Sequence, residues 1–192
     1  MALSTIDQNT ALIVVDLQRG IAALPAVHPV AGVAANAGRL AAAFRGHGLP
    51  VVLVSLAGSP GGRTERSKTG TAATPSQPPA DWAELLPQLD AQPRDHLISK
   101  KTRSAFIHTG LDEHLRDAGV TQVVIAGVAT SIGVESTARS AHDLGYHVTV
   151  AVDATTDLSA EAHQHSVSRI FPGLGESGTT DEVLTLLDRD RR

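Results

Sequence analysis

Short apolar runs alternate along the chain with longer stretches in which apolar side chains recur at helical spacing. The apolar runs occupy residues 11–15, 51–56, 96–99, 122–126 and 147–152. Their length and their content of branched side chains are typical of buried strands. Helical spacing covers residues 30–47, 111–118, 132–144, 160–171 and 180–187, with Gly48 and Gly119 as expected helix ends.

The order of these elements predicts a single α/β domain over residues 1–192. Strand–helix–strand units connect through right-handed crossovers, so we expect a three-layer α/β/α sandwich with a central parallel sheet of Rossmann-like type. A helical repeat protein is excluded, because no segment recurs at a fixed period. Ligands of such sheets bind beyond the carboxyl ends of the strands, which places Asp16, Lys100 and the turn at residues 130–133 on one rim.

Residues 57–79 interrupt this pattern. They are rich in Gly, Pro, Ser and Thr and contain the cations Arg63, Arg66 and Lys68. A loop of this length in a compact domain is either a lid or binding loop, or a plain surface or disordered segment. Both interpretations stay open, and the position of the loop after the carboxyl end of a strand favours the lid.

Composition narrows the possible functions. A chain of 192 residues with 42% hydrophobic residues suits one soluble globular domain. No apolar run approaches the roughly 20 residues of a membrane span, and residues 1–7 lack the regions of a signal peptide, so we expect a cytoplasmic protein. The net charge of -4 gives no support for a nucleic-acid partner. The absence of cysteine excludes disulfides and thiolate metal sites.

Residues 123–139 predict a buried strand, a sharp turn and a helix. Such a unit aims backbone N–H groups and the positive end of the helix dipole at one point, where a nucleophile and its oxyanion donors would lie. Gly133 occupies this point, in a chain without cysteine. The hydroxyls of Ser131, Ser136 and Thr137 lack a neighbouring His–Asp pair that would activate them, and Ser131 is more typical of an N-cap.

The same segment resembles the signature of the isochorismatase-like hydrolases. The residues that carry the resemblance are Gly127-Val128-Ala129-Thr130-Ser131, followed by Val134-Glu135-Ser136-Thr137-Ala138-Arg139. Most members of that superfamily have a catalytic cysteine at the position of Gly133. True isochorismatases resemble this chain in having glycine there, and they react without a covalent intermediate. The resemblance implies the isochorismatase-like hydrolase fold and a cis peptide between Val128 and Ala129.

Two upstream motifs extend the resemblance. Asp16 and Gln18 form an Asp-x-Gln motif, in which the family has its catalytic aspartate, although such an aspartate could also cap a turn. Lys100 is followed, after three residues, by Ser104-Ala105-Phe106, a spacing that selects Lys100 rather than Lys101 as the family's lysine. The alternative is that both lysines are solvated charges on a loop, without a functional role.

The resemblance implies roles for nine positions. We expect Asp16, Lys100 and Gly133 to be catalytic. We expect the substrate to be bound by Gln18, Arg103, Phe106, Ala129, Thr130 and Ile132. Arg103 could form a bidentate contact with a substrate carboxylate through its planar guanidinium, or it could be a surface cation.

The sequence favours neither a metal ion nor another cofactor. Nicotinamidase-like members of the superfamily hold a metal through an Asp-x-His motif near the second strand, but Ser55, Leu56 and Ala57 follow Val54 here. His163 and His165 lie two residues apart in a helical stretch and so face different directions, which makes them a poor pair of ligands.

Glycine at position 133 closes the route through a thiolate. An isochorismatase must protonate the vinyl carbon of an enol ether, forming an oxocarbenium-like species that water traps. Asp16 as the acid, a cavity above Gly133, and Lys100 with backbone N–H groups meet these needs. We therefore predict a metal-free hydrolase that acts on isochorismate or a similar small carboxylic acid, as a homodimer or homotetramer without nucleic-acid or membrane partners. Two alternatives stay open. The chain could be an impaired homologue of the cysteine amidases that binds small acids or a protein partner, or a variant whose cysteine has been replaced.

Overall fold

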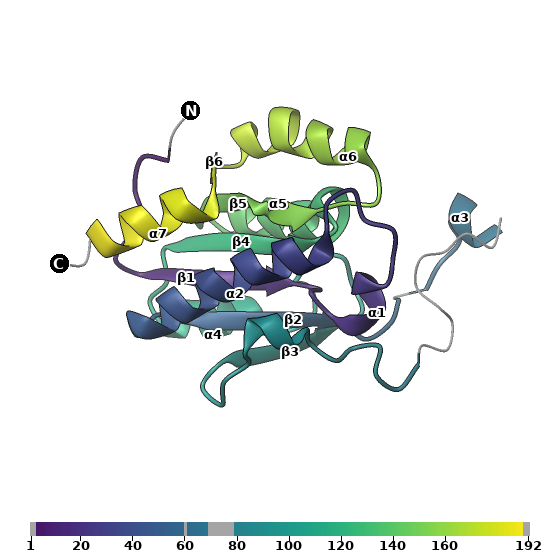
Figure 1. Cartoon of the computed structure of the whole chain (residues 1–192), viewed down its shortest axis with the longest axis horizontal. Coiled ribbons are helices and arrows are strands. Elements are labelled where there is room, and N and C mark those ends of the chain that lie inside the picture. The colour runs from purple at the N-terminus through teal and green to yellow at the C-terminus, as the bar shows by residue number, and fades with distance from the viewer. Residues whose placement is uncertain (1–2, 60, 69–78, 190–192) are drawn as a thin grey trace.

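Within residues 3–59, 61–68 and 79–189, which the computed structural model describes, six parallel strands form the centre of the fold (Figure 1). The strands are β1 (Thr10–Val15), β2 (Val51–Leu56), β3 (His96–Lys100), β4 (Gln122–Val128), β5 (His147–Thr156) and β6 (Glu176–Gly178). Their order across the sheet is β3-β2-β1-β4-β5-β6, and each neighbouring pair is parallel. The predicted α/β fold with a central parallel sheet is confirmed.

Helices cover both faces of the sheet. They are α1 (Arg19–Ala22), α2 (Val30–Gly46), α3 (Glu65–Lys68), α4 (Leu111–Asp117), α5 (Glu135–Asp143), α6 (Ala160–His165) and α7 (Thr180–Arg189). The buried side chains of α2 and α7 belong to one hydrophobic core, and those of α4 and α5 belong to a second. Figure 1 shows α2 and α7 crossing the near face of the sheet.

Alternation along β1 explains the two cores. Leu12 and Val14 lie in the core under α2 and α7, whereas Ala11, Ile13 and Val15 lie in the core under α4 and α5. Successive side chains of a strand point to opposite faces, so a strand covered on both sides must be apolar at every position. This requirement is the reason why the strands appear in the sequence as continuous apolar runs rather than as alternating ones.

Two strands differ from the sequence-based expectation. β6 was not predicted, because Glu176–Gly178 contains no apolar side chain to signal burial. β5 was expected to end at residue 152, because the charged Asp153 suggested the end of a buried strand. The backbone stays extended through Asp153, and β5 continues to Thr156.

Two of the predicted helices are irregular. The helix expected over residues 132–144 opens with a wide turn at Thr130–Val134 before α5 begins. The helix expected over 160–171 ends as α6 at His165 and continues through a wide turn to Ile170 and a short tight turn at Phe171–Gly173. Pro172 contributes to this ending, because proline has no N–H for a helical hydrogen bond.

The long loop after β2 is described only in part. Residues 57–59 and 61–68 are described, and α3 stands away from the body of the domain in Figure 1. Residues 60 and 69–78 lie outside the described part of the chain. The interpretation of residues 57–79 as a lid therefore stays a prediction.

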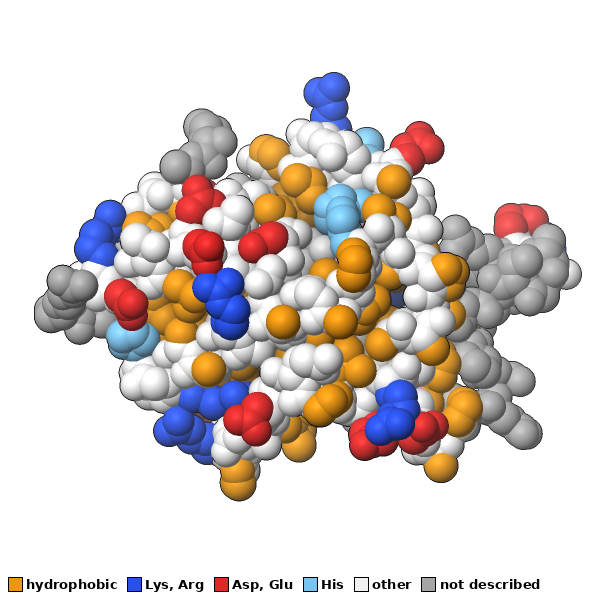
Figure 2. Space-filling model, viewed as in Figure 1, with side chains coloured by type: hydrophobic (Ala, Val, Ile, Leu, Met, Phe, Trp, Pro, Cys, Tyr) orange, Lys and Arg blue, Asp and Glu red, His pale blue; other side chains and the backbone are white. Residues whose placement is uncertain are grey.

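Charges of both signs are interspersed over the face of the molecule that carries α2 and α7 (Figure 2). This face presents no continuous basic patch of the kind that binds a polyanion. Among the helices of the described residues, none combines the length and the apolar character needed to cross a membrane.

Gly127 allows β1 and β4 to approach closely just before the edge of the sheet. Gly127 pairs with Val15 and has a φ of 126°, a conformation that residues with a side chain rarely adopt. A Cβ at this position would collide with the carbonyl of Val15. The next residue after Val15 is Asp16, so this glycine sets the spacing of the strands where the candidate site begins.

We expect Gly127→Ala to lower the free energy of unfolding by about 2–4 kcal/mol, because it adds backbone strain and a steric clash. Urea denaturation measures the change. The control is Gly32→Ala in α2, where an added Cβ meets no atom within 4 Å. That variant should be stabilised by about 0.5–1 kcal/mol. Equal stability of the two variants would contradict the assignment of Gly127.

Candidate active site

Asp16 directly follows β1 at the carboxyl edge of the sheet. The strand order changes direction between β1 and β4, which is where parallel α/β sheets open a crevice for ligands. Asp16 has a φ of 54°, and its N–H donates to the carbonyl of Val54 at 2.9 Å. The residue is only 5% exposed. The local backbone therefore fixes a carboxyl group in a largely dry position at the end of the central strands.

Lys100 is the last residue of β3, and its side chain reaches Asp16. Its Nζ donates to Asp16 Oδ2 at 2.7 Å and to the carbonyl of Thr102 at 3.1 Å, and the residue is 2% exposed. We expected the catalytic groups on adjacent strands, but β2 lies between β3 and β1. The long lysine stem makes up this distance. The next residue, Lys101, is exposed.

Burial and Lys100 act on Asp16 in opposite directions. Removal from water raises the pKa of Asp16 from 3.8 to about 6, although the charge and the hydrogen bond of Lys100 both lower it. Oδ2 carries the contact with Lys100, whereas the buried Oδ1 has no hydrogen-bond partner among the described residues. A carboxyl group with one committed oxygen and one free oxygen can hold a proton on the free oxygen and deliver it to a bound molecule.

Gly133 lies against Asp16, as the sequence motifs predicted. A Cβ built on Gly133 would lie 3.2 Å from Asp16 Oδ2, 3.2 Å from the carbonyl oxygen of Val128 and 3.0 Å from Val15 Cγ1. Any side chain at this position would therefore project onto the carboxyl group. The structure brings Asp16, Lys100 and Gly133 together at one point.

A cavity of about 100 Å³ opens beside this cluster. Its lining residues are Asp16, Ile21, Leu24, Leu56, Val128, Ala129, Ile132, Gly133 and Leu158. Ala129 and Ile132 were expected at the substrate site, and both lie in this wall. Asp16 is the single ionisable residue of the lining, so its free oxygen faces apolar surroundings. No sequence pattern indicated the wall residues that come from other loops, such as Leu24 and Leu158.

Four of the expected substrate contacts, Gln18, Arg103, Phe106 and Thr130, do not line this cavity. Gln18 is fully buried, and its amide donates to the carbonyls of Leu56 and Trp82 while its oxygen accepts from the N–H of Leu56. Phe106 packs in the core against Tyr146, with ring centroids 5.9 Å apart. Arg103 is exposed. The amide of Gln18 is fully hydrogen-bonded within the protein, and the ring of Phe106 is packed in the core. Both residues therefore stabilise the surroundings of the site.

Thr130 is not a wall residue but connects the turn that carries the wall to α6. Its buried Oγ1 lies 2.8 Å from His163 Nδ1 on α6, and the His163 ring contacts the ring of His28 edge-on. Burial and the neighbouring His28 lower the pKa of His163, and Asp157 partly opposes this effect. The imidazole is therefore neutral at pH 7, and one of its nitrogens is committed to the threonine hydroxyl.

The turn after β4 has the cis peptide that the resemblance implied, between Val128 and Ala129. Its hydroxyl groups serve other purposes than nucleophilic attack. Thr137 donates its hydroxyl to the carbonyl of Gly133 at 2.7 Å. No side chain caps the turn, and the N–H of Ser131 donates to Asp157 Oδ2 at 2.6 Å instead of toward the cavity. Ser131 is therefore not the expected N-cap.

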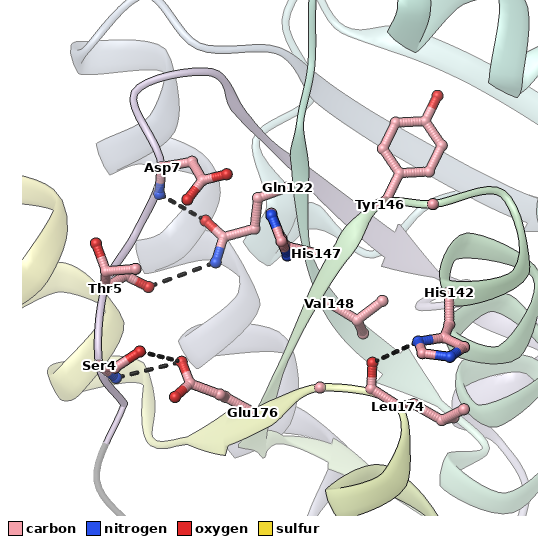
Figure 3. A pocket seen from close by; sticks show the side chains of 12 residues that line it. Ser4, Thr5, Asp7, Gln122, His142, Tyr146, His147, Val148, Leu174 and Glu176 are labelled. Atoms are coloured by element: carbon pink, nitrogen blue, oxygen red, sulfur yellow. Dashed lines mark hydrogen bonds between the residues drawn. The ribbon is translucent and has the colours of Figure 1, made fainter.

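A larger hollow of about 520 Å³ lies at the opposite, amino edge of the sheet (Figure 3). Its polar groups hold the N-terminal segment in place. Gln122 Oε1 accepts from the N–H of Asp7, and Glu176 Oε2 accepts from the N–H and hydroxyl of Ser4. Parallel sheets bind their ligands at the carboxyl edge, and Gln122 and Glu176 here are already paired with the N-terminal segment, so the smaller cavity at Asp16 is the better candidate site.

The described residues contain no group of three or more His, Asp or Glu side chains placed to hold a metal ion. Lys100 would repel a cation bound at Asp16, and the apolar side chains of the wall cannot ligate one.

Comparison with known proteins shows the family to which the chain belongs. The family model of the isochorismatase domain matches residues 10–182, so the chain belongs to the isochorismatase family. It is 39% identical to the uncharacterized isochorismatase family protein YwoC of Bacillus subtilis, over 92% of this chain and 93% of that protein. It is 30% identical to the ureidoacrylate amidohydrolase RutB of Pseudomonas syringae, over 92% of this chain and 83% of that protein.

A solved structure supports the same assignment. An isochorismatase family protein from Burkholderia thailandensis superposes with a TM-score of 0.86 at 36% identity, covering 96% of this chain and 98% of the other. The chain is therefore a probable hydrolase of this family, with a single six-stranded parallel sheet flanked by helices.

We expect Lys100→Met to raise the pKa of Asp16 above about 6, by roughly one pH unit or more, because the charge and the hydrogen bond that lower it are removed. Carbon NMR of the labelled aspartate carboxyl groups measures the titration. The control is Lys101→Met, which removes an exposed neighbouring cation and should leave the titration of Asp16 unchanged. An Asp16 titration that is identical in wild type and Lys100→Met would contradict the electrostatic description of the site.

Proposed function

We propose that this protein is a metal-free hydrolase of isochorismatase type, in which Asp16 acts as a general acid without a covalent intermediate. The observation that carries the proposal is a buried Asp16 with a raised pKa, whose Oδ1 has no hydrogen-bond partner among the described residues and whose Oδ2 lies 3.2 Å from the place of a Cβ on Gly133. The substrate is isochorismate or a similar small carboxylic acid that contains an enol ether.

The reaction requires only proton transfer and water. Asp16 Oδ1 donates its proton to the terminal vinyl carbon, and the electron pair of the double bond forms the new C–H bond. The resulting oxocarbenium-like species takes up water at the ether carbon, and the proton of that water returns to Asp16. The hemiketal then releases the alcohol and leaves a ketone, which is pyruvate when isochorismate is the substrate. Lys100 stabilises the carboxylate that forms between these steps.

The size and the lining of the cavity are suited to a small reacting group. Its volume of about 100 Å³ is below the roughly 300–1,000 Å³ that is usual for drug-sized ligands. The apolar wall of Ala129, Ile132 and their neighbours suits an uncharged vinyl group. In this proposal the enol ether occupies the space beside Gly133, and the charged carboxylates of the substrate lie outside the apolar part.

A second candidate is a homologue of the amidohydrolases that has lost catalysis and binds small acids or a protein partner. The likeness to ureidoacrylate amidohydrolases favours it, because this chain has no cysteine at all. Release of pyruvate from isochorismate by the purified protein would exclude it.

We expect the protein to release pyruvate from isochorismate, with a kcat/KM that falls about tenfold per pH unit above the pKa of about 6, because Asp16 must be protonated to act. Asp16→Asn should lower kcat/KM by at least about 10²-fold, since an amide donates no catalytic proton. A lactate dehydrogenase-coupled assay follows pyruvate.

Asp95→Asn is a matched control for this loss. Asp95 forms an equally buried ion pair, with Arg45 at 2.8 Å, at the far edge of the sheet. Its replacement should reduce stability while kcat/KM stays near that of wild type. Full activity in Asp16→Asn would show that Asp16 is not the acid.

We expect the thiol of Gly133→Cys to alkylate with iodoacetamide faster than an exposed thiol at pH 7, because Lys100 neutralises the neighbouring Asp16 carboxylate and the helix N-terminus lowers the thiol pKa. The same variant should lose enol-ether hydrolysis, since sulfur fills the space of the substrate. Gly32→Cys is the control: it lies in the first turn of α2 with open space around it, so it shares the helix N-terminus but lacks Asp16 and Lys100. Equal alkylation rates of the two thiols would place position 133 outside a functional site.

A further inference from the structure

Asp157 follows β5 and is buried beside the candidate site, with 2% of its surface exposed. Its Oδ2 accepts from the N–H of Ser131 at 2.6 Å. Its Oδ1 accepts from the N–H groups of Leu158 at 2.7 Å and Ser159 at 3.3 Å. Charge-assisted bonds to backbone N–H groups are stronger than those between neutral partners, so this carboxylate is a firm connection between two segments.

The segments joined by Asp157 are the walls of the cavity. Ser131 lies between Thr130 and Ile132 in the turn that carries Gly133, and Leu158 is a lining residue from the loop after β5. The backbone carbonyl of Asp157 also accepts from the N–H of Val27 at 2.8 Å, which holds the loop that follows the lining residue Leu24. One residue therefore connects three pieces of chain that are distant in sequence and adjacent around Asp16.

We propose that Asp157 is a positioning residue that holds the Thr130–Val134 turn, and Gly133 within it, in register with Asp16. It contacts neither Asp16 nor Lys100 through any hydrogen bond of the described residues, so it acts through the turn. The inference rests on the proposed function in one respect, the assignment of Asp16 and Gly133 to the reaction centre.

Two replacements separate this role from simple packing. Asp157→Asn keeps the shape but offers one acceptor oxygen and one NH₂ group, so it cannot accept from Ser131 and Leu158 at once. Asp157→Ser keeps a short acceptor for the N–H groups of the next residues, as serine does in turns, but it is too short to reach Ser131. Asp157→Ser therefore releases the turn and preserves the local loop, whereas Asp157→Asn breaks one of the two connections.

The unique thiol of Gly133→Cys reports on the position of the turn without any substrate, because the chain contains no other cysteine. The experiment measures the rate of iodoacetamide alkylation against pH, in Gly133→Cys alone and combined with Asp157→Asn or Asp157→Ser. The thiol pKa should be lowered in the single variant, where Lys100 neutralises the neighbouring Asp16, and should return toward about 8.5 with Asp157→Ser, which releases the turn.

Asp153→Asn in the same background is the matched control. Asp153 lies on the same strand and accepts from the N–H and hydroxyl of Thr180 at 2.7 and 2.8 Å, which connects β5 to α7 away from the cavity. It should cost stability without changing the thiol pKa.

The outcomes distinguish the positioning role of Asp157 from the assignment of Asp16 and Gly133 to the reaction centre. A lowered thiol pKa that neither Asp157 replacement changes overturns the positioning role and leaves the proposed site intact. An equal shift with Asp153→Asn also overturns the positioning role, since the effect is then one of general stability. An ordinary thiol pKa in Gly133→Cys alone removes the proposed site and this inference with it.

Discussion

The parallel pairing of β1 with β4 is the constraint on which the candidate site depends. The register opposes Val15 to Gly127, so the two strands end together and deliver Asp16 and the Thr130–Val134 turn to the same point. A shift by one residue would move one partner by about 3.3 Å and turn its side chains to the other face. Gly127 permits the close approach, and the two hydrophobic cores hold the register because each face of β1 is buried.

Burial of Asp16 has a cost that stability alone would not justify. The folded protein holds the Asp16 proton more tightly than the unfolded chain does, so ionisation of this group destabilises the fold. The cost is absent below the unfolded pKa of 3.8 and complete above about 6, and it amounts to about 3 kcal/mol at pH 7. Perturbed carboxyl groups of this kind concentrate at functional sites, where a retained proton is useful.

The features that could be predicted from the sequence are those that neighbouring residues in the chain determine. Continuous apolar runs revealed the five long strands, and motif spacing selected Asp16, Lys100 and Gly133, which the structure brings together. Features set by distant partners were not readable. β6 has no apolar residue and exists because it pairs with β5. Asp157 looks like any loop aspartate until the fold places Ser131 beside it. The resemblance implied a substrate contact for Gln18, but its hydrogen bonds to Leu56 and Trp82 were not readable because both partners are remote in sequence.

The glycine at position 133 has both a packing cause and a chemical consequence. Three groups lie within 3.0–3.2 Å of the place that a Cβ would take, so a side chain fits only if Val15, Asp16 or the Val128 carbonyl moves by a few tenths of an ångström. The same closeness means that no group other than Asp16 is presented to the cavity as an acid, base or nucleophile among its described lining residues. The proposed reaction uses this composition, because it asks Asp16 only to move a proton and takes the oxygen from water.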